Sequence, residues 1–166
     1  MVLWLSSEHL QHIAAHAEHT YPDECCGIML GTDQQGDRPC KILVELWSVG
    51  NAWDVDAANA MADVDTRFNA DDFTKSRRYW IDPLDMLSAQ RYARDRQMNI
   101  IGIYHSHPDH SATPSECDRA CAWPQYSYVI ASVQRGRVSD ILSWTLNPQH
   151  QFEAEPMLTT EASTRV

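Results

Sequence analysis

Two histidines and one aspartate are the residues of this chain whose types and spacing point most directly to chemistry. His105 and His107 end an apolar run, residues 99–104, that predicts a buried strand. Side chains two apart on a strand point to the same face, so both imidazoles face one point, and Pro108 ends the strand. Asp118 adds a carboxylate from the predicted first turn of the next helix. Nitrogen and oxygen donors suit zinc, and three protein ligands leave its fourth position to water, which predicts one catalytic zinc ion.

The segment from Ser115 to Asp118 also allows an interpretation without a metal. Ser-Glu-Cys-Asp fits a capping box, in which Ser115 caps a helix and Asp118 reaches back to the N–H of the cap. Two histidines at a strand end can likewise form a polar rim. Capping does not require the joint run of His105-Ser-His-Pro, Thr113-Pro-Ser and Asp118, and this joint pattern favours the metal site.

The remaining chain must supply the elements that position these side chains. Apolar residues at helical spacing and alternating apolar residues follow one another along the sequence, which predicts an α/β fold with one sheet flanked by helices. The expected elements are a helix over 6–19, strands over 24–32 and 41–49, an edge or third strand over 77–82, a helix over 83–97, the strand over 99–108, a short helix to residue 123, strands over 126–133 and 138–146, and an edge strand over 151–155.

Length and composition predict a single domain. The chain has 166 residues, of which 43% are hydrophobic, enough for one core. We assign residues 1–155 to this domain and expect the polar residues 156–166 to form a disordered tail. The acidic segment from Asp54 to Asp72 shows no clear period and predicts a loop with a short helical turn. We hypothesise that it flanks a substrate groove.

The net charge and the cysteine content indicate which class of partner and which cellular compartment to expect. A net charge of −10 argues against a nucleic-acid partner, which would need a Lys/Arg surface. The apolar run Met1 to Leu5 is short and lacks a positively charged region, so we expect neither a secretory signal nor a membrane span. Five cysteines, an odd number, predict no disulfide framework and suit the cytoplasm.

Two further groups of potential metal ligands lie outside this pattern. Four histidines share one face of the first helix, but no H-E-x-x-H glutamate stands between them, and we interpret the face as solvated. Cys117 and Cys121 are separated by three residues, whereas a deaminase-type zinc site requires two. We therefore expect no zinc at these cysteines. The histidines of the helix are His9, His12, His16 and His19.

The joint pattern resembles the JAMM (MPN-plus, Mov34/PAD-1) metallopeptidase family, whose signature is a distant Glu, then H-x-H, seven residues, Ser, two residues and Asp. His105, His107, Ser115 and Asp118 match this spacing, and Glu24, within the segment 21–31, matches the distant Glu. The resemblance covers nearly the whole chain and is closest to the small stand-alone bacterial members. It implies a single-domain, three-layer MPN fold with a mixed central sheet.

The resemblance also implies a mechanism and a substrate. His105, His107 and Asp118 would hold one zinc ion, which lowers the pKa of a water from about 15.7 towards 7. Glu24 would take the proton of that water and pass it to the leaving amine, and the Ser115 hydroxyl would share the oxyanion. The implied substrate is the C-terminal Gly-Gly tail of a ubiquitin-like or sulfur-carrier protein, joined by a peptide, an isopeptide or a cysteine-adduct bond.

Other functions stay open at this point. The same site would suit a zinc amidohydrolase that acts on a small molecule, and a non-catalytic MPN scaffold would keep the fold without the chemistry. The surroundings of His110 also resemble the RadC-like branch of the superfamily. A serine nucleophile at Ser106 is disfavoured, because the sequence around it is not a nucleophile elbow. The sequence leaves the oligomeric state open.

Overall fold

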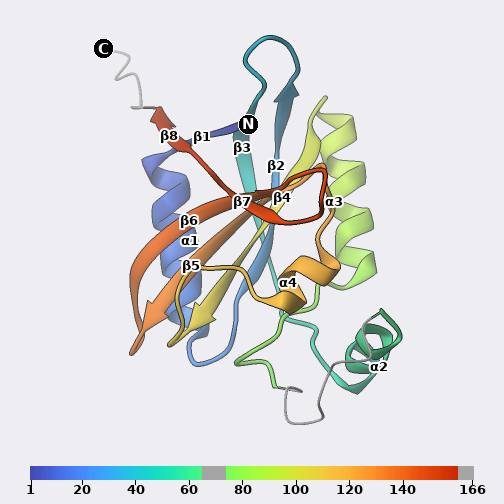
Figure 1. Cartoon of the computed structure of the whole chain (residues 1–166), viewed down its shortest axis with the longest axis vertical. Helices are drawn as coiled ribbons and strands as arrows, with labels where there is room; N and C mark the ends of the chain where they lie inside the picture. Colours follow the sequence, from blue (N-terminus) through green and yellow to red (C-terminus); the bar gives the residue numbers. More distant parts are fainter. Residues whose placement is uncertain (65–73, 161–166) are drawn as a thin grey trace.

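A computed structural model of the chain describes residues 1–64 and 74–160. Within these residues the strands form one sheet of eight, in the order β7-β6-β5-β4-β2-β3-β1-β8, with helices on both faces (Figure 1). This confirms the predicted α/β architecture. The strands are β1 (Val2–Ser6), β2 (Cys26–Gln34), β3 (Cys40–Val49), β4 (Asn99–Pro108), β5 (Ser127–Gln134), β6 (Arg137–Leu146), β7 (Phe152–Glu155) and β8 (Met157–Thr160). The helices are α1 (Ser7–Thr20), α2 (Val55–Val64), α3 (Pro83–Asp95) and α4 (Glu116–Cys121).

Strand β4 lies in the middle of the sheet. It pairs antiparallel with β2 and parallel with β5, and the hairpins β2-β3 and β5-β6 extend the sheet on either side. On the far side of β3, β1 pairs parallel with both β3 and β8. Strands β7 and β8 stand at opposite ends of the order although only Pro156 separates them, so the sheet curls and brings the end of β7 next to the start of β8.

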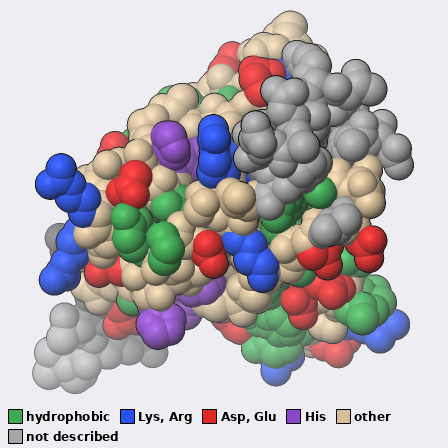
Figure 2. Space-filling model, turned by 90° about the horizontal axis from the view of Figure 1, so that it is seen from below, with side chains coloured by type: hydrophobic (Ala, Val, Ile, Leu, Met, Phe, Trp, Pro, Cys, Tyr) green, Lys and Arg blue, Asp and Glu red, His purple; other side chains and the backbone are tan. Residues whose placement is uncertain are grey.

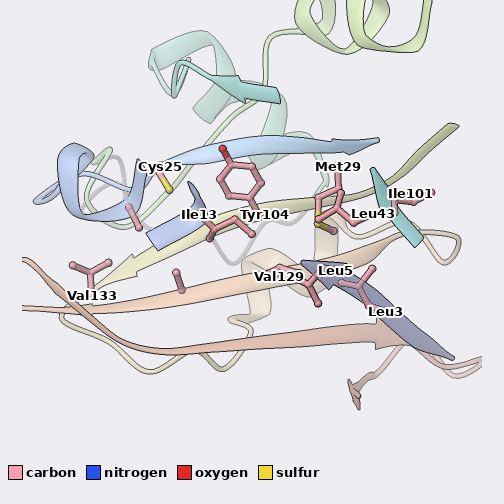
Figure 3. Packing of buried hydrophobic residues seen from close by; sticks show 12 residues of the cluster. Leu3, Leu5, Ile13, Cys25, Met29, Leu43, Ile101, Tyr104, Val129 and Val133 are labelled. Atoms are coloured by element: carbon pink, nitrogen blue, oxygen red, sulfur yellow. The ribbon is translucent and has the colours of Figure 1, made fainter. Parts of the chain in front are cut away.

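Successive side chains of β2 point to opposite faces of the sheet and pack in two separate hydrophobic clusters. Met29 packs with Ile13 of α1 in one cluster of buried residues, part of which is shown in Figure 3. Its neighbours Ile28 and Leu30 pack on the other face with Ala89 of α3. Helices α1 and α3 therefore cover opposite faces.

A β-bulge in β4 decides which face the predicted ligands take. The pairing with β2 shifts between Met29 and Leu30, so that Ile101 is left without an opposite residue. As a result, Ile101 packs on the face covered by α1, although Ile103 does not. Beyond the bulge the alternation is regular, and His105 projects on the same side as Ile103. This is the side on which Ile103 packs against Ala122, directly after α4.

Two predicted element types are wrong. Residues 77–82 form no strand; Asn51 holds them instead, because its side chain donates to the Arg78 carbonyl at 2.9 Å and accepts from the Trp80 N–H at 3.2 Å. The tail predicted over 156–166 begins as strand β8, because the open edge of β1 provides backbone partners. Residues 161–166 lie outside the described residues.

Two further differences are smaller. Strand β1 was not predicted, although its alternation of buried Leu3 and Leu5 with less buried neighbours is that of a strand. The helical turn expected in the acidic segment extends to the full helix α2. Residues 65–73 of that segment lie outside the described residues, and its role beside a groove stays a hypothesis.

None of the helices in the described part of the chain is both long and apolar enough to cross a membrane.

Candidate functional site

The structure brings the three predicted metal ligands to one point. His105 and His107 project from the end of β4, and Asp118 from the first turn of α4. The two Nε2 atoms lie 3.1 Å apart, and the Asp118 carboxylate oxygens lie 3.3 Å from each of them. One ligand atom from each residue falls within 4.8 Å of the others. The set is almost closed to solvent, with exposures of 0% for His105, 7% for His107 and 9% for Asp118.

Neighbouring groups orient both imidazoles. His107 Nδ1 lies 2.8 Å from the carbonyl oxygen of Ser111. A carbonyl only accepts hydrogen bonds, so Nδ1 carries the proton, and in a neutral ring Nε2 keeps its lone pair towards the other ligands. The His105 ring stacks on the Tyr79 ring, with centroids 4.5 Å apart and planes 26° apart. Both rings are therefore held with Nε2 directed at the shared point.

This donor set fits a zinc ion. Lone pairs of imidazole nitrogens and carboxylate oxygens that converge in a buried site repel one another unless a cation lies between them. Two nitrogens and one carboxylate are ligands that zinc accepts, and a tetrahedral ion held by three protein residues keeps one position open. The arrangement can therefore hold a zinc ion that remains accessible to a water molecule.

The electrostatics keep the carboxylate ionised. Burial would raise the pKa of Asp118, but the two imidazoles outweigh it and hold that pKa well below its usual range. Burial lowers the pKa of His105. For His107, the hydrogen bond and charge of Asp118 outweigh burial, so that its pKa is raised. Asp118 is thus in the form that binds metal.

Ser115 and Asp118 form the capping box that the sequence allowed as the alternative. The Asp118 N–H donates to Ser115 Oγ at 3.1 Å, and the Ser115 N–H donates to Asp118 Oδ2 at 2.7 Å. The Ser115 hydroxyl also donates to Oδ2, at 2.8 Å. The cap leaves Oδ1 facing His105, so the two interpretations describe one arrangement and do not exclude each other.

Glu24 is held beside the end of β4 by its backbone and by its neighbour. Its N–H donates to the Lys75 carbonyl at 2.8 Å, and its carbonyl accepts from the Asn51 amide at 3.1 Å. The N–H of the next residue, Cys25, donates to Ser106 Oγ at 2.8 Å, and the Ser106 N–H donates back to the Cys25 carbonyl at 3.2 Å. The residue between the two histidines thus fixes the position of Glu24.

The environment of Glu24 makes it a base near neutral pH. The side chain is 5% exposed, and burial, with a contribution from the charge of Asp118, raises the pKa of Glu24 to about 8. A carboxylate with such a pKa holds and releases a proton in the range where a catalytic base must work.

Two cavities meet at the site. A cavity of about 350 Å³ is lined by Glu24, His107 and Ser115, together with arginines of the segment after residue 76. On the other side of Asp118 a cavity of about 490 Å³ is lined mostly by apolar and aromatic side chains, among them Tyr79 and Trp123. A substrate can therefore extend to both sides of the predicted ligands.

Sequence reasoning missed the residues that position the ligands. Asn51 connects Glu24 to the segment that carries Tyr79, and Ser106 connects it to β4. Ser106 carried a local signal, because a residue between two histidines of a strand faces the opposite side. Asn51 and Tyr79 carried none, since their partners are distant in the sequence.

The histidine face of α1 is only partly solvated, which corrects our interpretation. His9 accepts from the Ser6 N–H at 3.1 Å within the helix cap. His12 bonds Ser48 Oγ at 2.8 Å, and His16 bonds the Tyr104 hydroxyl at 2.8 Å, whereas His19 is exposed. Three of the four thus tie α1 to itself or to the sheet. The five cysteines are free thiols.

Figure 2 shows one face of the molecule with its side chains coloured by type. On the face shown in Figure 2, Lys and Arg side chains lie apart from one another among acidic and hydrophobic ones. This distribution agrees with the net charge of −10.

Residues 6–147 match a protein family described as prokaryotic homologs of the JAB domain. A desampylase from Haloferax volcanii is 31% identical over 98 residues, which are 58% of this chain and 66% of that protein, slightly less than two thirds. The solution structure of a protein from Salinibacter ruber has a TM-score of 0.64 at 28% identity, over 100% of this chain and 95% of the other. A solution structure from Desulfitobacterium hafniense has a TM-score of 0.72 at 22% identity, over 96% and 94%, and shares the fold.

Proposed function

Because this chain belongs to the family of prokaryotic homologs of the JAB domain, we propose that it is a JAMM-type zinc metallopeptidase acting on ubiquitin-like or sulfur-carrier proteins. It hydrolyses the peptide, isopeptide or cysteine-adduct bond that follows the C-terminal Gly-Gly tail. The observation that carries the proposal is the convergence of two Nε2 atoms and one carboxylate, together with the buried Glu24, which shares a cavity with His107. A cytoplasmic location belongs to the proposal and rests on the odd number of cysteines.

His105, His107 and Asp118 hold the zinc ion. When bound, the ion supplies Lewis acidity, which makes a water molecule ionise near neutral pH. Glu24 accepts the proton of a water in the cavity that it lines, at a carboxylate oxygen, and later delivers the proton to the leaving nitrogen. Burial favours the protonated form of Glu24 and so makes the carboxylate a better proton acceptor than an exposed one.

Ser115 donates to the oxygen of the substrate carbonyl. Its hydroxyl hydrogen points to Asp118 Oδ2 in this structure, and rotation about the Cβ–Oγ bond redirects it into the cavity that Ser115 lines. A donor placed where negative charge develops is worth about 10² to 10³ in kcat. The backbone N–H bonds of the capping box remain in place during that rotation, so the helix stays capped.

The substrate class is supported by the relative and by the shape of the site. The name of the Haloferax volcanii relative denotes an enzyme that removes a ubiquitin-like modifier. A Gly-Gly tail has no side chains next to the scissile bond, so it needs little space beside the buried ligands. An extended tail is also the form in which peptides are commonly bound beside a sheet.

The test combines metal content with turnover. The full chain is loaded with zinc, the zinc per chain is measured, and ubiquitin-like proteins of the same cell, carrying a group joined to their Gly-Gly tails, serve as substrates. We expect one zinc per chain and hydrolysis by the wild type. Glu24→Gln should keep the zinc and the fold but lose about 10² to 10⁴ in rate.

Three results would contradict the proposal in different ways. Absence of both zinc and turnover would indicate the non-catalytic scaffold. Hydrolysis of short amides but not of Gly-Gly tails would indicate a small-molecule amidohydrolase. Full turnover by Glu24→Gln would remove Glu24 from the mechanism.

A further inference from the structure

Two cysteines that the proposed mechanism does not use lie next to each other on α4. Cys117 and Cys121 are one helical turn apart and therefore share one side of the helix. A hydrogen bond joins their side chains, and this bond, ahead of burial, raises the pKa of the Cys117 thiol. Both are free thiols in this structure. The two sulfur atoms are thus near enough to react with each other once one of them is oxidised.

The two thiols differ in their access to solvent. Cys121 is exposed, whereas Cys117 is half-buried and packs against the cluster around Trp53. Both line the cavity of about 490 Å³ that also reaches Asp118. A small oxidant such as hydrogen peroxide therefore meets Cys121 first and finds Cys117 directly behind it. An accessible cysteine with a second thiol beside it is the arrangement of oxidant-sensing pairs.

The remaining cysteines are placed differently. Cys25 and Cys26 are buried and follow one another in the chain, so solvent does not reach them. Cys40 is half-buried on β3, where its thiol donates to Gln34 Oε1 at 3.8 Å. An oxidant in solution should therefore act on the pair of α4 before it acts within the core.

A disulfide between Cys117 and Cys121 does not fit the helix as it stands. Cβ atoms at this helical spacing are about 5 to 6 Å apart, while a disulfide requires about 3.5 to 4.5 Å. The turn between the two residues must therefore tighten, and residues 118–120 must absorb the change. Helix α4 has only 6 residues, and its last turn is closed by an Ala122 N–H that donates to the Arg119 carbonyl at 3.3 Å, so few bonds resist the distortion.

Asp118 is the first residue of the turn that must tighten. Its Oδ1 lies 3.3 Å from His105 Nε2, and its Oδ2 lies 3.3 Å from His107 Nε2. A constellation of ligands keeps its function only while each group stays within about 0.5 Å of its position. The shortening that a disulfide demands is larger than this, so even a part of it, passed to the Asp118 backbone, separates the carboxylate from the two imidazoles.

We propose that Cys117 and Cys121 are an oxidisable pair whose disulfide displaces Asp118 and weakens the metal site. Hydrogen peroxide converts the Cys121 thiol into a sulfenic acid and leaves as water. The Cys117 sulfur then attacks the Cys121 sulfur, the S–S bond forms, and the hydroxyl group departs with the Cys117 proton as a second water. A dithiol reverses the change by taking up the disulfide bond itself. The pair stays reduced in a reducing compartment and responds when peroxide rises.

The first test counts thiols and measures zinc affinity in the full chain. After peroxide treatment without zinc, the unfolded chain should show three of its five thiols, and peptide mapping should find Cys117 joined to Cys121. Competition with a chelator should show that zinc affinity has fallen at least about tenfold. Treatment with a dithiol should restore both the thiols and the affinity.

A second readout needs neither zinc nor turnover. The Asp118 N–H donates to Ser115 Oγ at 3.1 Å, and amide hydrogen exchange reports on this bond. Oxidation should speed the exchange of this N–H about tenfold, whereas the amides of α3 should exchange as before. Bound zinc should in turn slow formation of the disulfide, because a ligand that holds Asp118 in place disfavours the distorted helix.

Two matched variants separate the pair from other targets of peroxide. Cys121→Ser should bind zinc like the reduced wild type and keep that affinity after peroxide, because it has no partner for Cys117. Cys40→Ser leaves the pair intact and should lose affinity as the wild type does. A loss of affinity in Cys121→Ser equal to that of the wild type would overturn the inference.

The remaining outcomes also decide between the inference and the proposed function. Retention of all five thiols, or a disulfide at Cys25 and Cys26 instead, overturns the inference. So does a disulfide on α4 that leaves both zinc affinity and the exchange of Asp118 unchanged. If the reduced chain binds no zinc, the proposed function is contradicted, while faster exchange at Asp118 on oxidation still supports the inference and unchanged exchange overturns it.

Discussion

Asp118 accepts two hydrogen bonds from Ser115 through Oδ2, while its Oδ1 lies 3.3 Å from His105 Nε2. The Asp118 carboxylate thus belongs both to the N-terminal cap of α4 and to the predicted metal site. A helix cap fixes the side chain of its N3 residue, and here that residue is the predicted ligand Asp118. The orientation of the carboxylate is therefore set before any metal binds.

Replacing Ser115 tests this dual use. Ser115→Ala removes the side-chain cap and should lower the free energy of unfolding by about 1 kcal/mol. It should also weaken zinc binding by about tenfold, because it releases the Asp118 carboxylate, and lower kcat by about 10² to 10³. Chemical unfolding, chelator competition and steady-state kinetics measure the three effects. Thr113→Ala, in the same cavity, is the control and should leave all three near wild type.

The buried Glu24 should make the stability of the metal-free protein depend on pH. The pKa of Glu24 is about 8 in the folded chain, against an ordinary value of 4.5. Between these values the folded state keeps a proton that the unfolded state has released, so the stability of the wild type falls as pH rises from about 4.5 to 8. Glu24→Gln removes this loss and should be more stable than the wild type at pH 8 by a few kcal/mol. Urea unfolding at several pH values, with a chelator present, measures the difference; parallel profiles would contradict it.

The ring of Tyr79 should matter for metal affinity through its contact with His105. Tyr79→Leu removes the stacked ring and frees the imidazole to rotate, so zinc affinity should fall by about tenfold. Tyr79→Phe keeps the ring and should bind zinc almost as the wild type does. Competition with a coloured chelator gives both affinities. Equal affinities for Leu and Phe would show that the stack does not orient His105.

Because β2 packs closely against β4, we expect that replacing Gly27 lowers the stability of the protein. A Cβ added there would overlap the ring of Tyr104, which the Ser48 and His16 side chains hold by hydrogen bonds. Gly27→Ala should therefore destabilise the protein by about 1 to 3 kcal/mol. Gly50→Ala is the control, because nothing lies near its Cβ, and its effect should stay within about 0.5 kcal/mol. Thermal unfolding of the two variants under one condition tests the contrast.

Local spacing explains what the sequence could predict. His105 and His107 share a face because strand alternation fixes it, and Ser115 and Asp118 meet because three residues are nearly one helical turn. Helix α3 could be predicted because Asp82 caps it and Pro83 stands in its first turn. The convergence of these elements was expected from the family resemblance, and the structure describes the contacts that produce it.

Several failures of prediction concern contacts between distant segments. Residues 77–82 contain the aromatic and β-branched residues of a strand, yet the amide of Asn51 takes the backbone groups that a strand would pair. Residues 157–160 belong to the segment that the sequence predicted as a polar tail, and only pairing with the edge of β1 makes them a strand. Lys41 is 2% exposed and donates to Ser127 Oγ at 3.0 Å, a burial that no local pattern signals.

The curling of the sheet around Pro156 has a consequence for biosynthesis. The Leu3 N–H donates to the Pro156 carbonyl at 3.0 Å, so a residue of the first described strand bonds one that the ribosome adds only after all the residues between them. Strand β1 then gains β8 as its outer neighbour. Until residues 157–160 have been added, the outer edge of β1 stays unpaired, and a nascent chain in this condition is open to wrong strand pairing. The native pairing of β1 with β8 can form only when residue 160 has left the exit tunnel.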